Sequence, residues 1–209
     1  MRSRNEQEKA ERRETLLNAA ETVFFKKGFE ATSMDDIANE AGFSRALLYV
    51  YFKDKKGIYQ ALRVRSSQAL HDRMIKYTNE HDKGIDKIKA TGYAYYHFYL
   101  QERHFFNCLT LNISLNNQSK NMERSEEGIE CEKAIMALMV DAIELGIKDG
   151  SLDSNKVQNP LETALFLRGS LHGMILMHDH DKQNILHQSG INKDKFITNG
   201  IDRVVESLS

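Results

Sequence analysis

Proline is almost absent from this chain, and that absence constrains the fold more than any other feature of the sequence. Only one proline, Pro160, occurs in 209 residues, so few helices can be interrupted by a missing backbone donor. Apolar residues recur at three- and four-residue intervals, as in Leu16, Ala19, Ala20 and Val23, and alternating strand-like runs are few. Because 41% of the residues are hydrophobic, the chain can bury a core. The sequence therefore predicts a globular all-α fold.

The helical segments are separated by Gly, Ser and Asp residues of the kinds that cap or end helices. We expect helices over residues 8–27, 33–42, 44–51, 54–76, 85–102, 105–115, 126–148, 160–178 and 194–208. The composition changes near Lys56, from short, capped helices to long amphipathic ones. We therefore place one domain at residues 1–55 and a second at residues 56–209.

The second and third segments are short and lie almost end to end. Ser33 is a good N-cap, and Asp36, three residues later, completes a capping box. Gly42 provides the left-handed residue of a tight turn, and Ser44 caps the next helix directly afterwards. Two short helices joined by so brief a turn must cross steeply, which is the geometry of a helix-turn-helix.

The residues of this segment resemble the TetR family of transcriptional regulators. The resemblance covers residues 16–62 and rests on a Thr or Ser cap, Ile-Ala, Ala-Gly, a hydrophobic residue, Ser, Leu-Tyr, a Phe and a Lys, which here are Thr32, Ser33, Ile37, Ala38, Ala41, Gly42, Phe43, Ser44, Leu48, Tyr49, Phe52 and Lys55. It implies an N-terminal three-helix DNA-binding domain with a helix-turn-helix, followed by a larger helical ligand-binding and dimerisation domain.

The resemblance also implies which side chains meet DNA. It places Thr32, Ser33, Tyr49, Tyr51 and Lys55 at phosphates, and Arg45, Ala46 and Leu47 at base edges, with Ser44 on the same surface. Ala46, Leu47 and Val50 depart from the residues that are usual in the family, so the operator preference cannot be transferred from relatives.

The residue types of the third segment suggest what each side chain offers to DNA. Leu47 can make only apolar contact, which suits a thymine methyl. Arg45 either chelates the O6 and N7 atoms of a guanine or neutralises a phosphate. Tyr49 has an alternative interpretation, since it can also complete the small core of the domain.

An aromatic helix over residues 93–100 is apolar on all sides and is expected to be central. Its tyrosine hydroxyls and imidazole need partners, either in a bound molecule or within the protein. The resemblance favours a ligand, because this helix usually lines the inducer pocket of the family. The predicted ligand-binding residues are Tyr93, Tyr96, His97, Phe105, Met136, Met139, Phe166 and His172.

Two further segments carry apolar stripes that predict a homodimer. The stripes consist of Leu161, Leu165, Gly169, His172 and Leu176 on one segment and Phe196, Ile201, Val204, Val205 and Leu208 on the other. They form either a four-helix interface with a second copy, as in the family, or part of the core of one chain. A dimer would match a double-stranded, pseudo-palindromic operator with two half-sites.

Several classes of function are not expected. The sequence lacks a Gly-rich phosphate loop, GxSxG and HExxH, so we predict neither an enzyme nor a cofactor. The run from His178 to Asp181, with His187, has metal-ligand side chains, but its polarity favours a solvated loop and we predict no metal site. No apolar run is long enough for a membrane helix, and Cys108 and Cys131 have the character of reduced thiols, so a cytoplasmic location is expected.

These observations together predict a DNA-binding transcriptional regulator. The hypothesis is a repressor that leaves its operator when a small, largely apolar ligand binds the second domain. Basic and acidic residues are nearly balanced, at 29 and 30, so DNA binding must be local. The alternative is a helical protein-binding module without ligand-controlled DNA binding.

Overall fold

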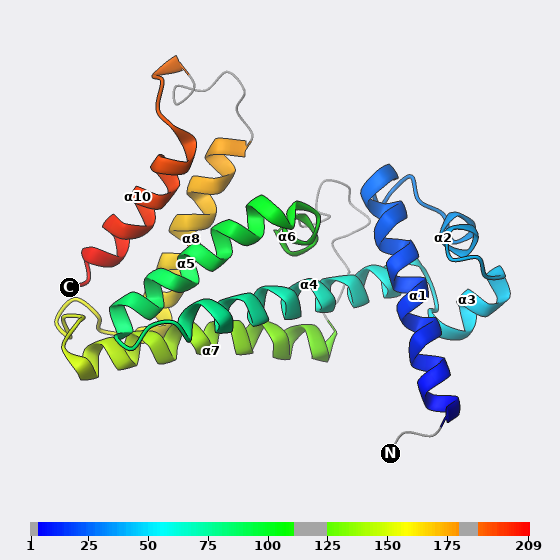
Figure 1. Ribbon diagram of the computed structural model, residues 1–209, viewed down its shortest axis with the longest axis horizontal. Coiled ribbons are helices and arrows are strands. Elements are labelled where there is room, and N and C mark those ends of the chain that lie inside the picture. The colour runs from blue at the N-terminus through cyan, green and yellow to red at the C-terminus, as the bar shows by residue number, and fades with distance from the viewer. Residues whose placement is uncertain (1–3, 111–124, 180–187) are drawn as a thin grey trace. The chain divides into compact units, whose positions relative to one another are not determined.

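A computed structural model of the protein describes residues 4–110, 125–179 and 188–209. Within these segments the regular elements are all helices and no strand occurs, which confirms the all-α prediction. Figure 1 shows the helices along the chain, namely α1 (Arg4–Lys27), α2 (Met34–Glu40), α3 (Arg45–Tyr51), α4 (Lys55–Thr78), α5 (Gly84–Gln101), α6 (Arg103–Thr110), α7 (Glu126–Asp149), α8 (Pro160–Asp179) and α10 (Lys193–Glu206).

The helix ends agree closely with those expected from the caps. Gly28 and Gly42 both have positive φ angles, of 79° and 69°, and each follows a helix end that the sequence predicts. One difference is that α6 begins at Arg103, directly after α5, where the amide of Glu102 still donates to the carbonyl oxygen of Phe98 at 2.9 Å. The part of that helix expected beyond Thr110 lies outside the described residues.

The chain divides into two compact units. The first consists of the described residues up to Ser66 and those from His104 to Gly128, and the second consists of the described residues in Ser67–Arg103 and Ile129–Ser209. α4 contributes residues to both units. The domain boundary at residue 55 stays a prediction, and it coincides with the point where α4 begins.

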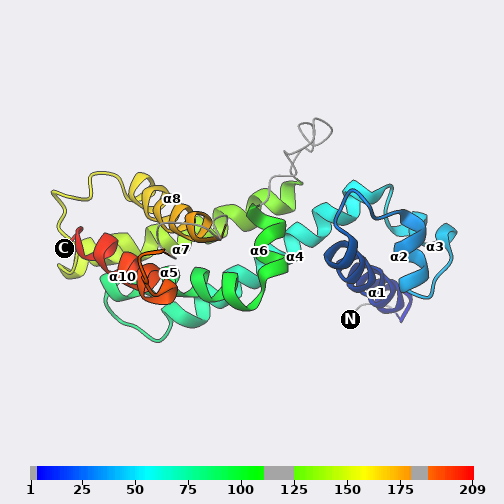
Figure 2. The same ribbon diagram turned by 90° about the horizontal axis from the view of Figure 1, so that it is seen from above.

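The first unit has a small core built by α1, α2, α3, the start of α4 and α6. Figure 2 shows α2 between α1 and α3, and α2 contacts both neighbours. The fully buried side chains of this core include Leu16, Ile37, Leu48, Ile58 and Leu62. The apolar faces of short segments therefore close around one another, and the remaining faces of α2 and α3 are left for solvent or a partner.

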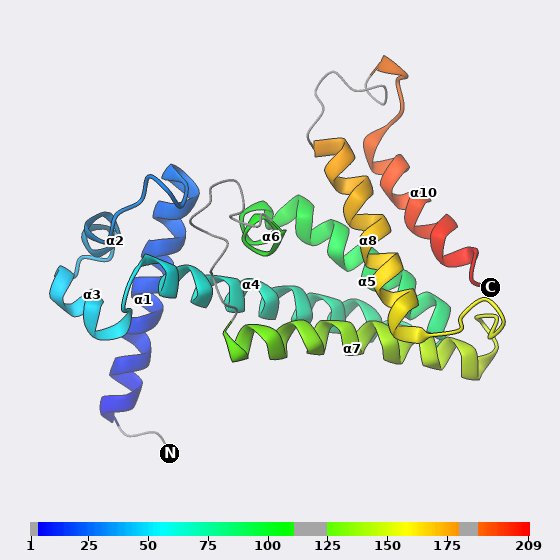
Figure 3. The ribbon, with the colours of Figure 1, turned by 180° about the vertical axis from the view of Figure 1, so that it is seen from behind.

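The second unit is organised around α5, α8 and α10, which pack on one another (Figures 1 and 3). The start of α5 also approaches α7 very closely, because a Cβ added at Gly84 would lie 2.0 Å from the amide nitrogen of Gly146. Only glycine fits at such a crossing. The hydrophobic core of this unit includes Ile88, Ile143 and Leu167.

Among the described helices, none combines the length and the apolar character that are needed to cross a bilayer.

Candidate DNA-binding surface and ligand cavity

The start of α2 is fixed by a capping box, and the turn between α2 and α3 by Gly42 and the cap of α3. The Ser33 hydroxyl accepts from the Asp36 amide, and the Asp36 carboxylate accepts from the Ser33 amide, as a capping box requires. Lys27 donates to Asp36 at 2.6 Å, and this ammonium, together with Ser33, holds the pKa of Asp36 well below its usual range. Ser44 then caps α3 by accepting from the amide of Leu47 at 3.2 Å. The predicted helix-turn-helix is confirmed in its local structure.

One face of α3 is buried in the first core and the opposite face is open. Leu48 is fully buried, which fixes the rotation of this short helix. Arg45 and Ala46 are exposed and Leu47 is half-buried. Tyr49 and Val50 are 44% and 69% exposed. The exposure of Tyr49 argues against a role in completing the core.

Arg45 is oriented by two neighbours on this open face. Its guanidinium donates to Asp35 of α2 at 2.8 Å and to the Tyr49 hydroxyl at 3.3 Å. It also lies 5.5 Å from the centroid of the Tyr49 ring. These contacts keep the arginine on the outer surface of the helix-turn-helix. Because the pair with Asp35 is exposed, it can be exchanged for a contact to DNA at small cost.

Two of the residues expected at phosphates are used inside the protein instead. Thr32 is 3% exposed, and its hydroxyl donates to the carbonyl oxygen of Gly28 at 2.7 Å. The Lys55 ammonium donates to the carbonyl oxygens of Phe29, Glu30 and Thr32 at 2.7, 3.2 and 2.8 Å. Lys55 therefore ties the start of α4 to the loop between α1 and α2, and its three donors are occupied there.

The other expected DNA contacts lie at or near the surface. Ser33 and Ser44 are exposed, but both hydroxyls already serve as helix caps. Tyr51 is half-buried and packs against the first core. The structure thus brings Ser33, Ser44 and the exposed part of α3 onto the surface of one helix-turn-helix, and leaves Thr32 and Lys55 beneath it.

The tyrosines of α5 find hydrogen-bond partners within the second unit. Tyr93 donates to both carboxylate oxygens of Asp202 at 3.1 Å, and Tyr96 donates to Asp194 at 2.5 Å. Burial, reinforced by these carboxylates, raises the pKa of both phenols. Of the two explanations that the sequence leaves open, partners within the protein account for these hydroxyls.

The two histidines of the predicted ligand site also have tyrosine partners. Nδ1 of His97 lies 2.8 Å from the Tyr77 hydroxyl, and Nδ1 of His172 lies 2.9 Å from the Tyr95 hydroxyl. Burial lowers the pKa of His172, and the charge of Arg168 lowers it further. The Nδ1 atoms of both rings are therefore bound within the protein.

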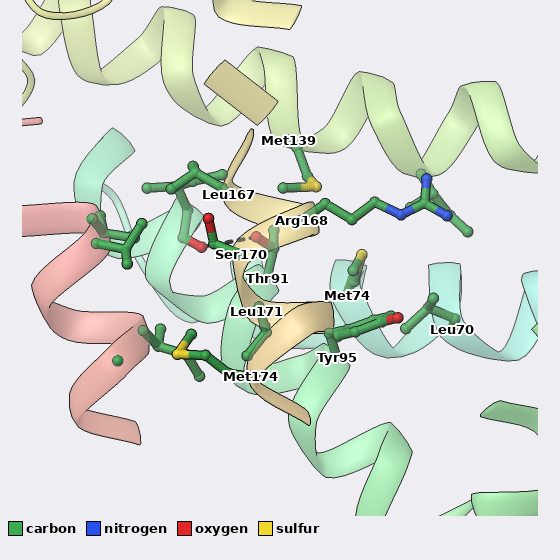
Figure 4. Close-up of a pocket in the computed structure, with 17 residues that line it drawn as sticks. Leu70, Met74, Thr91, Tyr95, Met139, Leu167, Arg168, Ser170, Leu171 and Met174 are labelled. Atoms are coloured by element: carbon green, nitrogen blue, oxygen red, sulfur yellow. Dashed lines mark hydrogen bonds between the residues drawn. The ribbon is translucent and has the colours of Figure 1, made fainter. Parts of the chain in front are cut away.

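The second unit contains a cavity of about 40 Å³ with apolar walls (Figure 4). Its walls come from five helices, α4, α5, α7, α8 and α10. The lining residues are Leu70, Met74, Ile88, Thr91, Gly92, Tyr95, Ile135, Met139, Leu167, Arg168, Ser170, Leu171, Met174, Gly200, Ile201, Val204 and Val205. Three of these are methionines, whose flexible thioethers can make room for molecules of different shape.

Of the eight predicted ligand-binding residues, Met139 lines this cavity. Phe105 lies in the first unit, where its ring packs edge-on against Phe25, and Phe166 is 60% exposed. Met136 is half-buried beside Arg168. Tyr93, Tyr96, His97 and His172 are not among the residues of the wall, and their polar atoms contact the partners described above.

The cavity residues that the sequence analysis missed share a recognisable spacing. Ile88, Thr91 and Tyr95 lie on one face of α5 at three- and four-residue intervals, and Leu70 and Met74 do so on α4. When the residues of α5 are sorted by helix face, Tyr95 falls on the same face as Ile88 and Thr91, whereas Tyr93 and Tyr96 do not. No comparable signal identifies Arg168.

The two apolar stripes expected at a dimer interface differ in exposure. On α8, Leu161 and Leu165 of the predicted stripe are 50% and 53% exposed, and His172 and Leu176 are half-buried. On α10, by contrast, Ile201 and Val205 are 4% exposed, because α10 packs on α5 and α8 of the same chain. The stripe of α10 therefore belongs to the core of the chain, and the stripe of α8 is the open one.

The described residues hold no group of three potential metal-ligating side chains. The run of histidines and aspartates from 178 to 181, with residue 187, lies outside the residues whose side chains are described. Both cysteines are free thiols. Burial raises the pKa of Cys108 to about 11.

Known proteins resemble the first unit in sequence and the whole chain in fold. A family model described as "Bacterial regulatory proteins, tetR family" matches residues 16–62. The HTH-type transcriptional regulator TtgR of Pseudomonas putida is 26% identical over 165 residues, which cover 73% of this chain and 76% of TtgR. The HTH-type transcriptional repressor BepR of Brucella suis biovar 1 is 41% identical over 59 residues, or 28% of either chain.

A solved structure extends the likeness to the second unit. The transcriptional regulator FadR from Bacillus subtilis, crystallised in complex with stearoyl-CoA, matches with a TM-score of 0.67 at 15% identity. The match covers 93% of this chain and 96% of FadR. At this identity the likeness concerns the fold, which includes both units.

Proposed function

We propose that this chain, which belongs to the TetR family of transcriptional regulators, is a repressor that an apolar ligand releases from its operator. The family and the relatives are DNA-binding regulators, and the chain is a regulator and not an enzyme. The proposal has three parts, which concern the DNA contact, the ligand and the assembly.

The open face of α3 is the observation that carries the DNA contact. Arg45 supplies a guanidinium at this surface, while Ala46, Leu47 and Val50 supply apolar contact. Arginine binds guanine edges or phosphates, and aliphatic side chains meet thymine methyls in the major groove. Lys55 and Thr32 are better explained as supports of the turn, and the Ser33 hydroxyl as a helix cap, so phosphate contacts would come from Tyr49 and Tyr51.

The cavity of the second unit supports a ligand-binding role. A volume of about 40 Å³ is far below the roughly 300 Å³ or more that a small-molecule site needs. A ligand must therefore displace side chains or helices when it enters, and methionines 74, 139 and 174 are the most adaptable of those. The FadR neighbour, whose structure contains stearoyl-CoA, is consistent with a ligand that has a long apolar chain at this fold.

α4 offers a physical route from the cavity to the DNA-binding unit. Ile58 and Leu62 of this helix are buried in the first core, and Leu70 and Met74 line the cavity. A ligand that moves the cavity end of α4 acts on the same helix that Lys55 ties to the turn before α2. Couplings of this kind are typically about 1 to 3 kcal/mol, or roughly 5- to 150-fold in affinity.

The exposed stripe of α8 supports the assembly of two chains. Large apolar side chains gathered on one helix face are costly in water and commonly mark an interface. Gly169 and Gly173 leave open space where a Cβ would lie, so another helix can approach closely. A symmetric dimer would present two copies of α3 to two half-sites.

The proposal is tested by titrating the protein onto fluorescent DNA from upstream of its own gene. Ala46→Glu on α3 should abolish specific binding, because it places a carboxylate against DNA. Ala137→Glu is the matched control, since Ala137 is an exposed alanine of α7 in the second unit, and it should leave binding unchanged. Equal affinities for the two variants, or no binding by the unaltered protein, would instead favour a protein-binding module.

A further inference from the structure

The mostly apolar wall of the cavity in the second unit contains one charged residue, Arg168, and one tyrosine, Tyr95. The Tyr95 hydroxyl lies 2.9 Å from Nδ1 of His172. In Figure 4 the guanidinium of Arg168 and the hydroxyl of Tyr95 lie on the same side of the view, away from Met174 and Leu167. The remaining lining consists of aliphatic side chains and methionines, together with Gly92, Gly200 and the hydroxyl residues Thr91 and Ser170.

The charges beside this part of the wall belong to Arg168 and Glu132. Burial raises the pKa of Tyr95 and lowers that of His172, so both side chains are neutral near pH 7. Nη1 of Arg168 lies 3.5 Å from Oε1 of Glu132, and the two side chains are 40% and 36% exposed. An ion pair with this separation and exposure contributes only about 0–1 kcal/mol to stability. An incoming anion can therefore take the place of Glu132 at Arg168.

The described contacts of Arg168 leave room for a second carboxylate. Both Glu132 and the sulfur of Met136, at 3.6 Å, contact Nη1. A guanidinium carries five N–H donors in a planar fork that matches a carboxylate in two parallel hydrogen bonds. Arg168 is itself a lining residue, so the apolar body of a molecule whose carboxylate binds the fork can follow the aliphatic stem of Arg168 toward the apolar space.

We propose that the cavity selects an amphipathic monoanion, a carboxylic acid with an unbranched or compact apolar body, whose carboxylate binds Arg168. This inference rests on the proposed ligand-binding function and adds the charge of the ligand to it. A neutral lipophile would leave the fork without a new partner. A ligand with several negative charges would meet only one described cation in the wall, and Glu132 beside it.

The test is calorimetric titration of the full chain with three probes that share one alkyl chain, namely decanoate, decanol and decylammonium. Decanoate should bind roughly 10- to 100-fold more tightly than decanol, as expected for charge-assisted hydrogen bonds. Decylammonium should bind least. Each methylene removed from the acid should weaken binding about fourfold, because the body lies in an apolar space.

Substitutions on both sides of the ion pair locate the head group. Arg168→Met keeps the stem and removes the charge, so decanoate should lose its advantage over decanol, whereas Arg203→Met, at an exposed arginine of α10, should not change it. Glu132→Gln removes the competing carboxylate and should tighten decanoate binding by roughly 1.5- to 5-fold. Structural damage is not expected to increase affinity. Glu132→Gln therefore tests the recognition of the carboxylate even if Arg168→Met fails to fold.

The outcomes separate this inference from the proposed function. Equal binding of decanoate and decanol, or no effect of Glu132→Gln, would overturn head-group recognition while an apolar ligand site remains. Failure of all three probes to bind would overturn the inference together with the ligand-binding function. Operator binding by the chain is measured separately and does not depend on either result.

Discussion

Replacing Lys55 by methionine should destabilise the first unit and should not remove a phosphate contact. The ammonium donates to three backbone carbonyls, in two part-buried bonds and one exposed bond, and lies 4.5 Å from the centroid of the Phe29 ring. Methionine keeps the aliphatic stem but leaves these carbonyls without their donor. Because solvent can reach part of the site, we assign about 1 kcal/mol to each of the two shorter bonds and less to the others.

The expected loss in the free energy of unfolding is therefore about 3 kcal/mol. Urea denaturation followed by circular dichroism measures it. Lys56→Met is the matched control, because the neighbouring Lys56 is exposed, and its effect should stay within about 0.5 kcal/mol. The difference between the two variants isolates the contribution of the Lys55 hydrogen bonds.

The salt dependence of DNA binding tests the alternative role of Lys55, which is a contact to a phosphate. If Lys55 neutralised a phosphate, its removal would lower the slope of log affinity against log salt by about 0.9. We expect an unchanged slope under conditions where the variant is folded. The role assigned to Lys55 would be refuted if Lys55→Met were as stable as Lys56→Met and if its slope of log affinity against log salt were lower by about one.

Three shorter predictions concern other parts of the molecule. Leu47→Ser should change the ranking of operator variants at one base position by about 1 kcal/mol or more, and an unchanged ranking would move Leu47 away from the bases. Leu165→Glu should give folded monomers in light scattering, because this side chain is 53% exposed in the single chain; a persistent dimer would place the interface elsewhere. Burial raises the pKa of Cys108 to about 11, so a thiol reagent at pH 8 should modify Cys131 quickly and Cys108 only after unfolding, and rapid labelling of both would contradict this assignment.

Local signals in the sequence are sufficient for the helix-turn-helix. Ser33 with Asp36, Gly42 and Ser44 each act within a few residues of the chain, and a cap or a left-handed turn depends little on distant partners. The structure bears out each of these assignments. The order and approximate bounds of the helices follow from the same kind of local evidence, combined with helical periodicity.

Side-chain partners across the fold cannot be predicted in this way. The family resemblance places Lys55 at a phosphate, and nothing in the sequence shows that three carbonyl oxygens from residues 29–32 converge on it. The stripe of α10 is compatible with a dimer interface in the sequence, and only packing against α5 and α8 reveals that it is internal. An amphipathic stripe indicates that a face is covered and does not identify what covers it.

The same limit applies to the ligand site. Tyr93 and Tyr96 are attractive candidates because their hydroxyls require partners, but Asp202 and Asp194 provide them from α10. Those carboxylates lie about a hundred residues away in the chain. Met139 does lie in the cavity wall. A methionine on an apolar helix face suits an adaptable wall, and that criterion does not depend on a distant partner. Its role in ligand binding stays a prediction.

The most direct test of ligand-controlled DNA binding is the operator affinity of the protein with and without a ligand that calorimetry shows to bind the second unit. We predict that saturating ligand weakens operator binding by roughly 5- to 150-fold, and that operator DNA weakens ligand binding by the same factor, as linkage requires. An operator affinity that stays the same when the cavity is occupied would contradict the account, because it would show that the ligand does not distinguish the DNA-binding state.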